Sequence, residues 1–78
     1  MKTKRLNILI DMLIEVMGYK RYELEIVELY GIYFITLPTY SIKATDLIKL
    51  ENILPKKASI GIYSNIFSGL SIRTEIKK

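Results

Sequence analysis

The spacing of apolar residues is typical first of a helix and then of two strands, and this series occurs twice along the chain. The order of these elements limits the folds that the chain can adopt. Residues 4–17 follow a helical period, and residues 22–29 and 32–37 have the character of strands. Residues 41–54, 58–63 and 70–76 then repeat the series without convincing residue-by-residue identity. This αββαββ order favours a four-stranded antiparallel sheet with both helices on one face, because each element then buries its apolar side.

The predicted fold is therefore an α+β two-layer sandwich with the strand order 3-4-2-1. Moving the last strand to the front would produce the βαββαβ order of ferredoxin-like domains, so we interpret the fold as a circularly permuted ferredoxin-like sandwich. Residues 1–78 are expected to form one domain, because a chain of 78 residues supports a single core. The alternative is a dimer that completes a larger sheet through its edge strands.

The first predicted helix is more apolar than a helix with one buried face needs to be. Its polar residues form a single stripe of Lys4, Asn7, Asp11 and Glu15, and Gly18 follows its last turn. We therefore expect this helix to contact more than one sheet face. Asp11 and Glu15 are interpreted as the solvated side of the helix rather than as a paired-carboxylate site.

Short polar segments are expected to end the other elements. Tyr30 and Gly31 form a two-residue hairpin turn in which glycine supplies a positive φ angle. Ser41 or Thr45 is the expected N-cap of the second helix, and residues 55–57 end that helix. Residues 38–40 end the first pair of strands.

A loop is predicted at residues 64–69, with Phe67 near its tip. An aromatic residue there is suited to anchoring into a pocket of a partner protein. The interpretation that we favour from the sequence is that Phe67 and Ile66 fold back and close the open end of the sandwich.

The composition argues against catalysis. The chain has no cysteine and no histidine, so it lacks a thiolate nucleophile, the usual general base near neutral pH and the commonest ligands for zinc. It also has no phosphate-binding glycine loop and no spacing of carboxylates typical of a metal site. We therefore predict a non-enzymatic protein without cofactor or metal.

The apolar segment near the start is too short to span a bilayer and is interrupted by acidic residues. No small-residue cleavage pattern follows it. We expect a cytoplasmic protein that does not associate with membranes. The many Ile, Lys, Leu and Tyr residues indicate an A/T-rich genome or a mobile element. If the protein is virus-encoded, its expected location is the cytoplasm of the host cell.

The register of the first hairpin predicts an exposed apolar cluster. If Leu29 pairs with Ile32 across the turn, residues 24, 26, 35 and 37 face the helices. The opposite face then carries Val27, Leu29, Ile32 and Phe34, which we predict to be a contact surface for a protein. A register shifted by one residue would reverse the two faces, and side chains from the termini are a second way to cover the cluster.

The same strand partly resembles the base-stacking strand of RNA-recognition domains. Only Gly31, Phe34 and Ile35 match that pattern. At the key stacking position the pattern has an aromatic residue but this chain has Ile32, and at the next position the pattern has a small residue but this chain has Tyr33. The match covers eight positions and is rejected.

A second set of candidate residues points to nucleic acid or to an acidic partner. The formal net charge is +4, and the predicted topology gathers most of the cations outside the strands at one end of the sandwich. Tyr63 and Arg73 lie on the outer face of the second hairpin, where they are able to stack on a base or to pair with a carboxylate; the alternative is a solvated cross-strand contact between the two. The basic end comprises Lys2, Lys4, Arg5, Lys56, Lys57, Lys77 and Lys78, with Tyr30 on its rim.

Two functional hypotheses follow. The first is a small non-catalytic binding protein, homodimeric and acting through protein contacts, such as a regulator or inhibitor encoded by a phage or mobile element. The second is a small basic nucleic-acid-binding module. The apolar cluster and the apolar first helix favour the first hypothesis.

Overall fold

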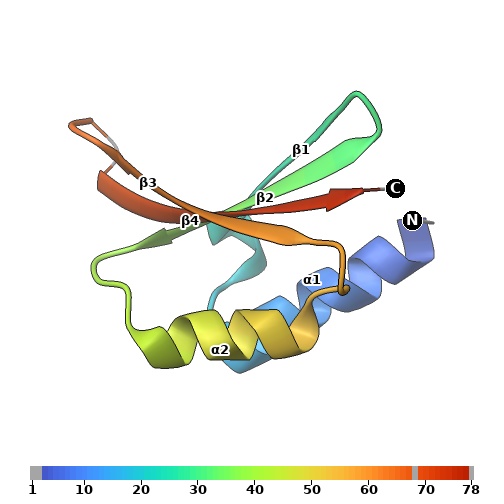
Figure 1. Ribbon diagram of the computed structural model, residues 1–78, viewed down its shortest axis with the longest axis horizontal. Helices are drawn as coiled ribbons and strands as arrows, with labels where there is room; N and C mark the ends of the chain where they lie inside the picture. The colour runs from blue at the N-terminus through green and yellow to red at the C-terminus, as the bar shows by residue number, and fades with distance from the viewer. Residues whose placement is uncertain (1–2, 68, 78) are drawn as a thin grey trace.

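The protein consists of a four-stranded sheet and two helices that cover one of its faces (Figure 1). The structure is a computed structural model that describes residues 3–67 and 69–77. The elements in chain order are α1 (Thr3–Met17), the 3₁₀ turn η1 (Arg21–Glu23), β1 (Glu25–Leu29), β2 (Ile32–Thr39), α2 (Ala44–Ile53), β3 (Ser59–Asn65) and β4 (Gly69–Lys77). Neither described helix combines the length and the apolar character that are needed to cross a bilayer.

The strands form one antiparallel sheet in the order β1-β2-β4-β3, which is the predicted order. The two-layer α+β architecture is therefore confirmed. Its relation to ferredoxin-like domains by circular permutation stays an interpretation of this strand order. The long central pairing of β2 with β4 runs from Ile32 opposite Lys77 to Thr39 opposite Leu70. The two hairpins diverge from the helix layer toward their tips (Figure 1).

The hydrophobic core lies between the helices and the inner face of the sheet. Its buried members come from both helices, from β2 and β4 and from the residue before β1: Leu6, Leu9, Ile10, Leu13, Leu24, Tyr33, Ile35, Leu37, Leu50, Ile72 and Ile76. Thr74 is buried among them, and its hydroxyl donates a hydrogen bond to the carbonyl oxygen of Ile35 over 3.3 Å. Alternation along β2 and β4 thus places every second side chain in the core.

The expectation that α1 contacts more than one sheet face is wrong. Its inner side packs on the sheet and on α2, but Ile8, Met12 and Val16 remain exposed. These three residues are four positions apart, so they form a ridge along the outer side of the helix. The sandwich has only two layers, and no described element lies beyond α1 to cover this ridge.

The predicted ends of several elements are corrected. The N-cap of α2 is Lys43, not Ser41 or Thr45, and its N–H donates to the Asp46 carboxylate over 3.2 Å. Residues 21–23 form a 3₁₀ turn instead of the start of a strand, because the Glu23 carboxylate accepts a hydrogen bond from the N–H of Lys20. Strand β2 continues through Pro38 to Thr39, because β4 extends alongside it.

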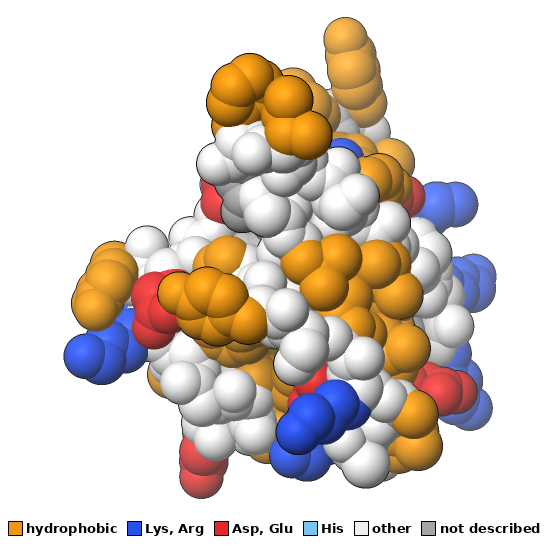
Figure 2. Space-filling model, turned by 90° about the vertical axis from the view of Figure 1, so that its left-hand side faces the viewer, with side chains coloured by type: hydrophobic (Ala, Val, Ile, Leu, Met, Phe, Trp, Pro, Cys, Tyr) orange, Lys and Arg blue, Asp and Glu red, His pale blue; other side chains and the backbone are white. Residues whose placement is uncertain are grey.

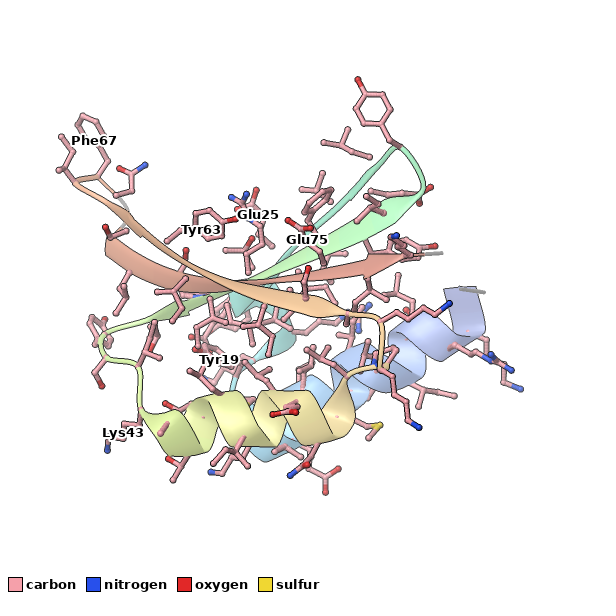
Figure 3. The ribbon with its side chains drawn as sticks, viewed as in Figure 1. Tyr19, Glu25, Lys43, Tyr63, Phe67 and Glu75 are labelled. Carbon is pink, nitrogen blue, oxygen red and sulfur yellow. The ribbon has the colours of Figure 1, made fainter. Side chains whose placement is uncertain are left out.

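The hydroxyl of Tyr19 links this connection to the sheet. It lies between the helix layer and the sheet (Figure 3) and donates a hydrogen bond to the carbonyl oxygen of Pro38. Burial raises the pKa of Tyr19 above its ordinary value, so the hydroxyl keeps its proton and remains a donor. The aromatic and basic segment 19–22 therefore serves as an anchored helix-to-strand connection.

The turn between β1 and β2 has two residues, as predicted, and both have positive φ angles. Tyr30 has φ 52° and Gly31 has φ 76°. This geometry is that of a type I′ turn, which matches the twist of a hairpin. Glycine adopts positive φ angles without strain. A tyrosine in the left-handed region is destabilised by roughly 1–2 kcal/mol, because its Cβ lies too close to the carbonyl oxygen.

Replacing Tyr30 with asparagine is therefore expected to stabilise the protein. Asparagine tolerates the left-handed region, so we expect the free energy of unfolding to rise by about 0.5–1 kcal/mol. Chemical denaturation followed by circular dichroism measures this change. Tyr40→Asn is the matched control, because Tyr40 is also fully exposed but has no positive φ angle. A lower denaturation midpoint for Tyr30→Asn than for the control would contradict the strained-turn interpretation.

Candidate protein-binding surface

The sheet face opposite the helices, here called the open face, carries the predicted apolar cluster. Leu29 pairs with Ile32 and Val27 with Phe34, so the predicted register is correct. The exposed fractions are 51% for Leu29 and 37% for Val27, while Ile32 and Phe34 are half-buried. Neither of the two helices in the described part of the chain covers these residues, and the apolar cluster of Val27, Leu29, Ile32 and Phe34 faces solvent.

A shallow depression of ≈ 210 Å³ lies in the open face beside this cluster. Its apolar part comes from Val27, Leu29 and Phe34. Charged and polar side chains complete its border at Glu25, Thr36 and Arg73. The depression thus combines an apolar floor with one acidic and one basic group, which is the usual composition of a protein contact site.

Tyr63 and Arg73 lie on the open face, as predicted, and they stack on each other. The Cζ atom of Arg73 is 4.5 Å from the centre of the Tyr63 ring, a cation–π geometry. The pair joins edge strand β3 to central strand β4. Because the ring holds the guanidinium beside the depression, Arg73 has a defined position from which to meet a carboxylate of a partner.

Gly61 makes this stacking possible, a role that sequence reasoning missed. A Cβ atom at this position would lie 2.7 Å from the Cε2 atom of Tyr63. The ring therefore occupies the space that a side chain at residue 61 would need. The sequence signal was a glycine two positions before an aromatic residue, on the same face of a strand.

The open face is not basic overall. Glu25, Tyr63 and Glu75 all point away from the helices (Figure 3). Ser59 Oγ donates a hydrogen bond to Glu75 Oε2 over 3.4 Å, and Arg73 lies on the same face. The acidic side chains at positions 25 and 75 balance the basic side chains of this face, which disfavours the approach of a phosphate backbone.

The tips of the two hairpins carry exposed aromatic side chains. Tyr30 is exposed at 98% and Phe67 at 92%, and hydrophobic side chains stand out at the top of the molecule in Figure 2. The favoured interpretation, in which Phe67 and Ile66 close the end of the sandwich, is therefore wrong. Strand pairing continues to Asn65 and Gly69, so the hairpin carries this tip beyond the core. The Asn65 carboxamide oxygen accepts a hydrogen bond from the N–H of Phe67, which fixes the bend.

Part of the predicted basic end is present. Lys56, Lys57 and Lys77 border one depression of ≈ 370 Å³ beside Pro55 and Ile76. Lys4 and Arg5 belong to the first turn of α1, which begins at the same end of the long axis (Figure 1). Lys2 and Lys78 lie outside the described residues. The turn at Tyr30 also lies toward this end, but it is raised above the open face (Figure 1).

The remaining charged candidates have structural explanations. Asp11 and Glu15 are both exposed on α1, and Asp11 makes an ion pair of 3.8 Å with Arg21. Among residues 3–67 and 69–77, no group of three or more acidic side chains is arranged to hold a metal ion. The open face is therefore the surface with the most features of a binding site.

A second hollow, which sequence reasoning did not predict, lies between α2 and edge strand β3. It has a volume of ≈ 510 Å³, and six of its eight lining residues are apolar. Its lining residues are Leu47, Glu51, Leu54, Pro55, Lys56, Ala58, Ile60 and Ile62. The signal for it was the absence of charged residues from the strand at residues 59–65.

Comparisons with protein-family models, curated proteins and solved structures found no match to this chain.

Proposed function

We propose that this protein is a small non-catalytic binding protein whose open face contacts a protein partner, in the manner of a regulator or inhibitor. The observation that carries the proposal is the exposed apolar cluster beside the depression that Arg73 and Glu25 border. Apolar side chains cost free energy when they face water, and a contiguous group of them on a folded domain typically marks a contact surface. The exposed tips at Tyr30 and Phe67 extend this surface at its two ends.

The charges of the open face favour a protein over nucleic acid. A nucleic-acid surface gains its affinity from cations that neutralise phosphates. Here Arg73 is engaged with the Tyr63 ring, and Glu25 and Glu75 lie nearby on the same face. An interface with an apolar centre and a rim of mixed charge suits a partner protein of complementary shape.

The proposal is tested by capturing partners with the purified protein and with two variants. We expect Leu29→Glu to lose the captured partner, because it replaces an apolar contact with a carboxylate whose burial in the interface costs free energy. Ile8→Glu is the matched control, because Ile8 and Leu29 are both 51% exposed but lie on opposite sides of the molecule. Quantitative mass spectrometry compares the proteins retained by each bait from a cell lysate.

Circular dichroism must show that both variants are folded. The proposal expects the control to retain the partner that Leu29→Glu loses. If Leu29→Glu and the unmodified protein retain the same proteins in the same amounts, the open face is not the binding surface.

The second candidate function is nucleic-acid binding at the basic end. It is favoured by the position of Lys56, Lys57 and Lys77 around one depression. This function predicts a mobility shift with DNA or RNA that weakens steeply with salt and disappears in Lys56→Glu/Lys57→Glu. If no shift occurs at low salt with single- and double-stranded DNA and RNA, nucleic-acid binding is eliminated. That result is the one expected if the protein binds a protein partner instead.

A further inference from the structure

The two edges of the sheet differ in how well they resist pairing with another strand. Strand β1 has five residues, of which Glu25 and Glu28 are charged. Strand β3 has seven residues, Ser59–Asn65, and none of them is charged or proline. Charged and short edge strands discourage the addition of a further strand, while long uncharged ones permit it. The β3 edge is therefore the edge that is open to pairing.

The hollow of ≈ 510 Å³ between α2 and β3 lies along this same edge. Ile62 borders it and is 54% exposed on the helix side of β3. On α2, Leu47 and Glu51 line the hollow, and Ile48 lies near Glu51 because the two are three residues apart. Ile48 is 56% exposed. An additional strand on β3 would cover Ile62 and extend toward this side of α2.

We propose that a second copy of the chain occupies this edge, with the two β3 strands antiparallel about a two-fold axis and the two sheets joined into one of eight strands. Antiparallel pairing of identical strands is self-complementary, so the same surface serves both copies and the assembly closes as a dimer. Pairing centred on Ile62 uses all seven residues of β3. It also keeps Ile60 and Ile62 of both copies on the helix side, because side chains alternate with a period of two.

The charges beside the hollow are compatible with self-pairing. Glu51 and Lys56 line it, one acidic and one basic, so a two-fold arrangement brings no excess of like charge together. Strand pairing alone buries little surface, and a stable interface needs about 1,000 Å² or more. The hollow adds to the area of strand pairing, because the inner side chains of both β3 strands and the adjoining sides of both α2 helices become covered.

The proposed axis is perpendicular to the sheet, because the paired strands are antiparallel and their inner side chains share one side. Both helix layers then lie on one side of the dimer, and both open faces lie on the other. The dimer would thus present two apolar clusters in the same direction. This inference does not depend on the proposed partner binding, because β3 and α2 supply all of its evidence.

Light scattering coupled to size exclusion tests the dimer. We expect a mass of twice the 9.1-kDa chain for the unmodified protein. Ile62→Lys is expected to halve that mass, because a lysine on an edge strand blocks pairing. Ile8→Lys, an isoleucine of similar exposure on α1, should keep the dimer mass. A monomer mass for the unmodified protein across the accessible concentration range would overturn the proposal. The β3 edge would then be open to a strand from a different protein instead of a second copy.

Cysteine crosslinking tests the location of the axis without depending on the stability of the lysine variant. The chain has no cysteine, so single substitutions are unambiguous. Ile62→Cys is expected to form a disulfide-linked dimer under mild oxidation, since residue 62 of each copy is opposite its equivalent. Val27→Cys, on edge strand β1 and on the open face, should remain monomeric in non-reducing electrophoresis. Crosslinking of Val27→Cys in place of Ile62→Cys would place the contact on the other edge or face and overturn the proposal.

Discussion

Replacing Leu37 with alanine is expected to lower the free energy of unfolding by about 2–5 kcal/mol. Leu37 is completely buried on central strand β2, opposite Ile72 of β4. A domain of this size has roughly 4–12 kcal/mol of stability, at about 0.05–0.15 kcal/mol per residue, so the loss is a large fraction of the total. Denaturant unfolding monitored by circular dichroism gives the change directly, provided that the slope of the transition stays constant.

Leu29→Ala is the matched control for this prediction. Leu29 is a leucine on the neighbouring strand β1, but it is 51% exposed on the open face. Its truncation is expected to cost less than about 1 kcal/mol, because little surrounding structure contacts it. Equal destabilisation by the two substitutions would mean that the assignment of the two sheet faces is incorrect.

Phe34→Ala is expected to weaken the proposed partner complex by about 30-fold or more. An aromatic side chain at the centre of an interface typically contributes 2 kcal/mol or more when it is truncated, and each 1.4 kcal/mol corresponds to about a factor of ten. Phe34 lines the depression beside Arg73, on a strand that is paired on both sides. Titration calorimetry with the purified partner measures the dissociation constants of its complexes with the unmodified protein and with Phe34→Ala.

The control for Phe34→Ala is Tyr22→Ala. Tyr22 is an aromatic residue with 80% exposure, but it lies in η1, outside the apolar cluster. We expect its removal to leave the affinity unchanged within a factor of about two, as for most residues outside a binding hot spot. If Tyr22→Ala weakens binding as much as Phe34→Ala does, the contact does not centre on the open face.

The hairpin register was predictable because two local signals agreed. Gly31 marked the turn, and the alternation of Leu24 and Ile26 against Glu23 and Glu25 assigned the faces. Once the register is set, the positions of Val27 and the rest of the apolar cluster follow from a period of two. The strand order was predictable from the order of the elements, since few topologies bury every apolar side.

Other features depend on tertiary contacts that the local pattern does not contain. Ser41 and Thr45 have the side chains of a helix cap, but Asp46 accepts the N–H of Lys43 and the helix begins there. Phe67 is apolar, yet continued pairing of Asn65 with Gly69 keeps it away from the core. For α1, composition alone did not reveal that Ile8 and Met12 would be left in solvent.

The sheet order β1-β2-β4-β3 has internal symmetry, because each αββ half contributes one edge strand and one central strand. Within the sheet the halves meet through their second strands, β2 and β4, which are antiparallel over eight residue pairs, and in the helix layer they meet through α1 and α2. The chain therefore resembles a pair of αββ units fused through residues 40–43, a connection that adds no strand to the sheet. Neither unit has a complete core alone, so either half made separately would require the other as its folding partner.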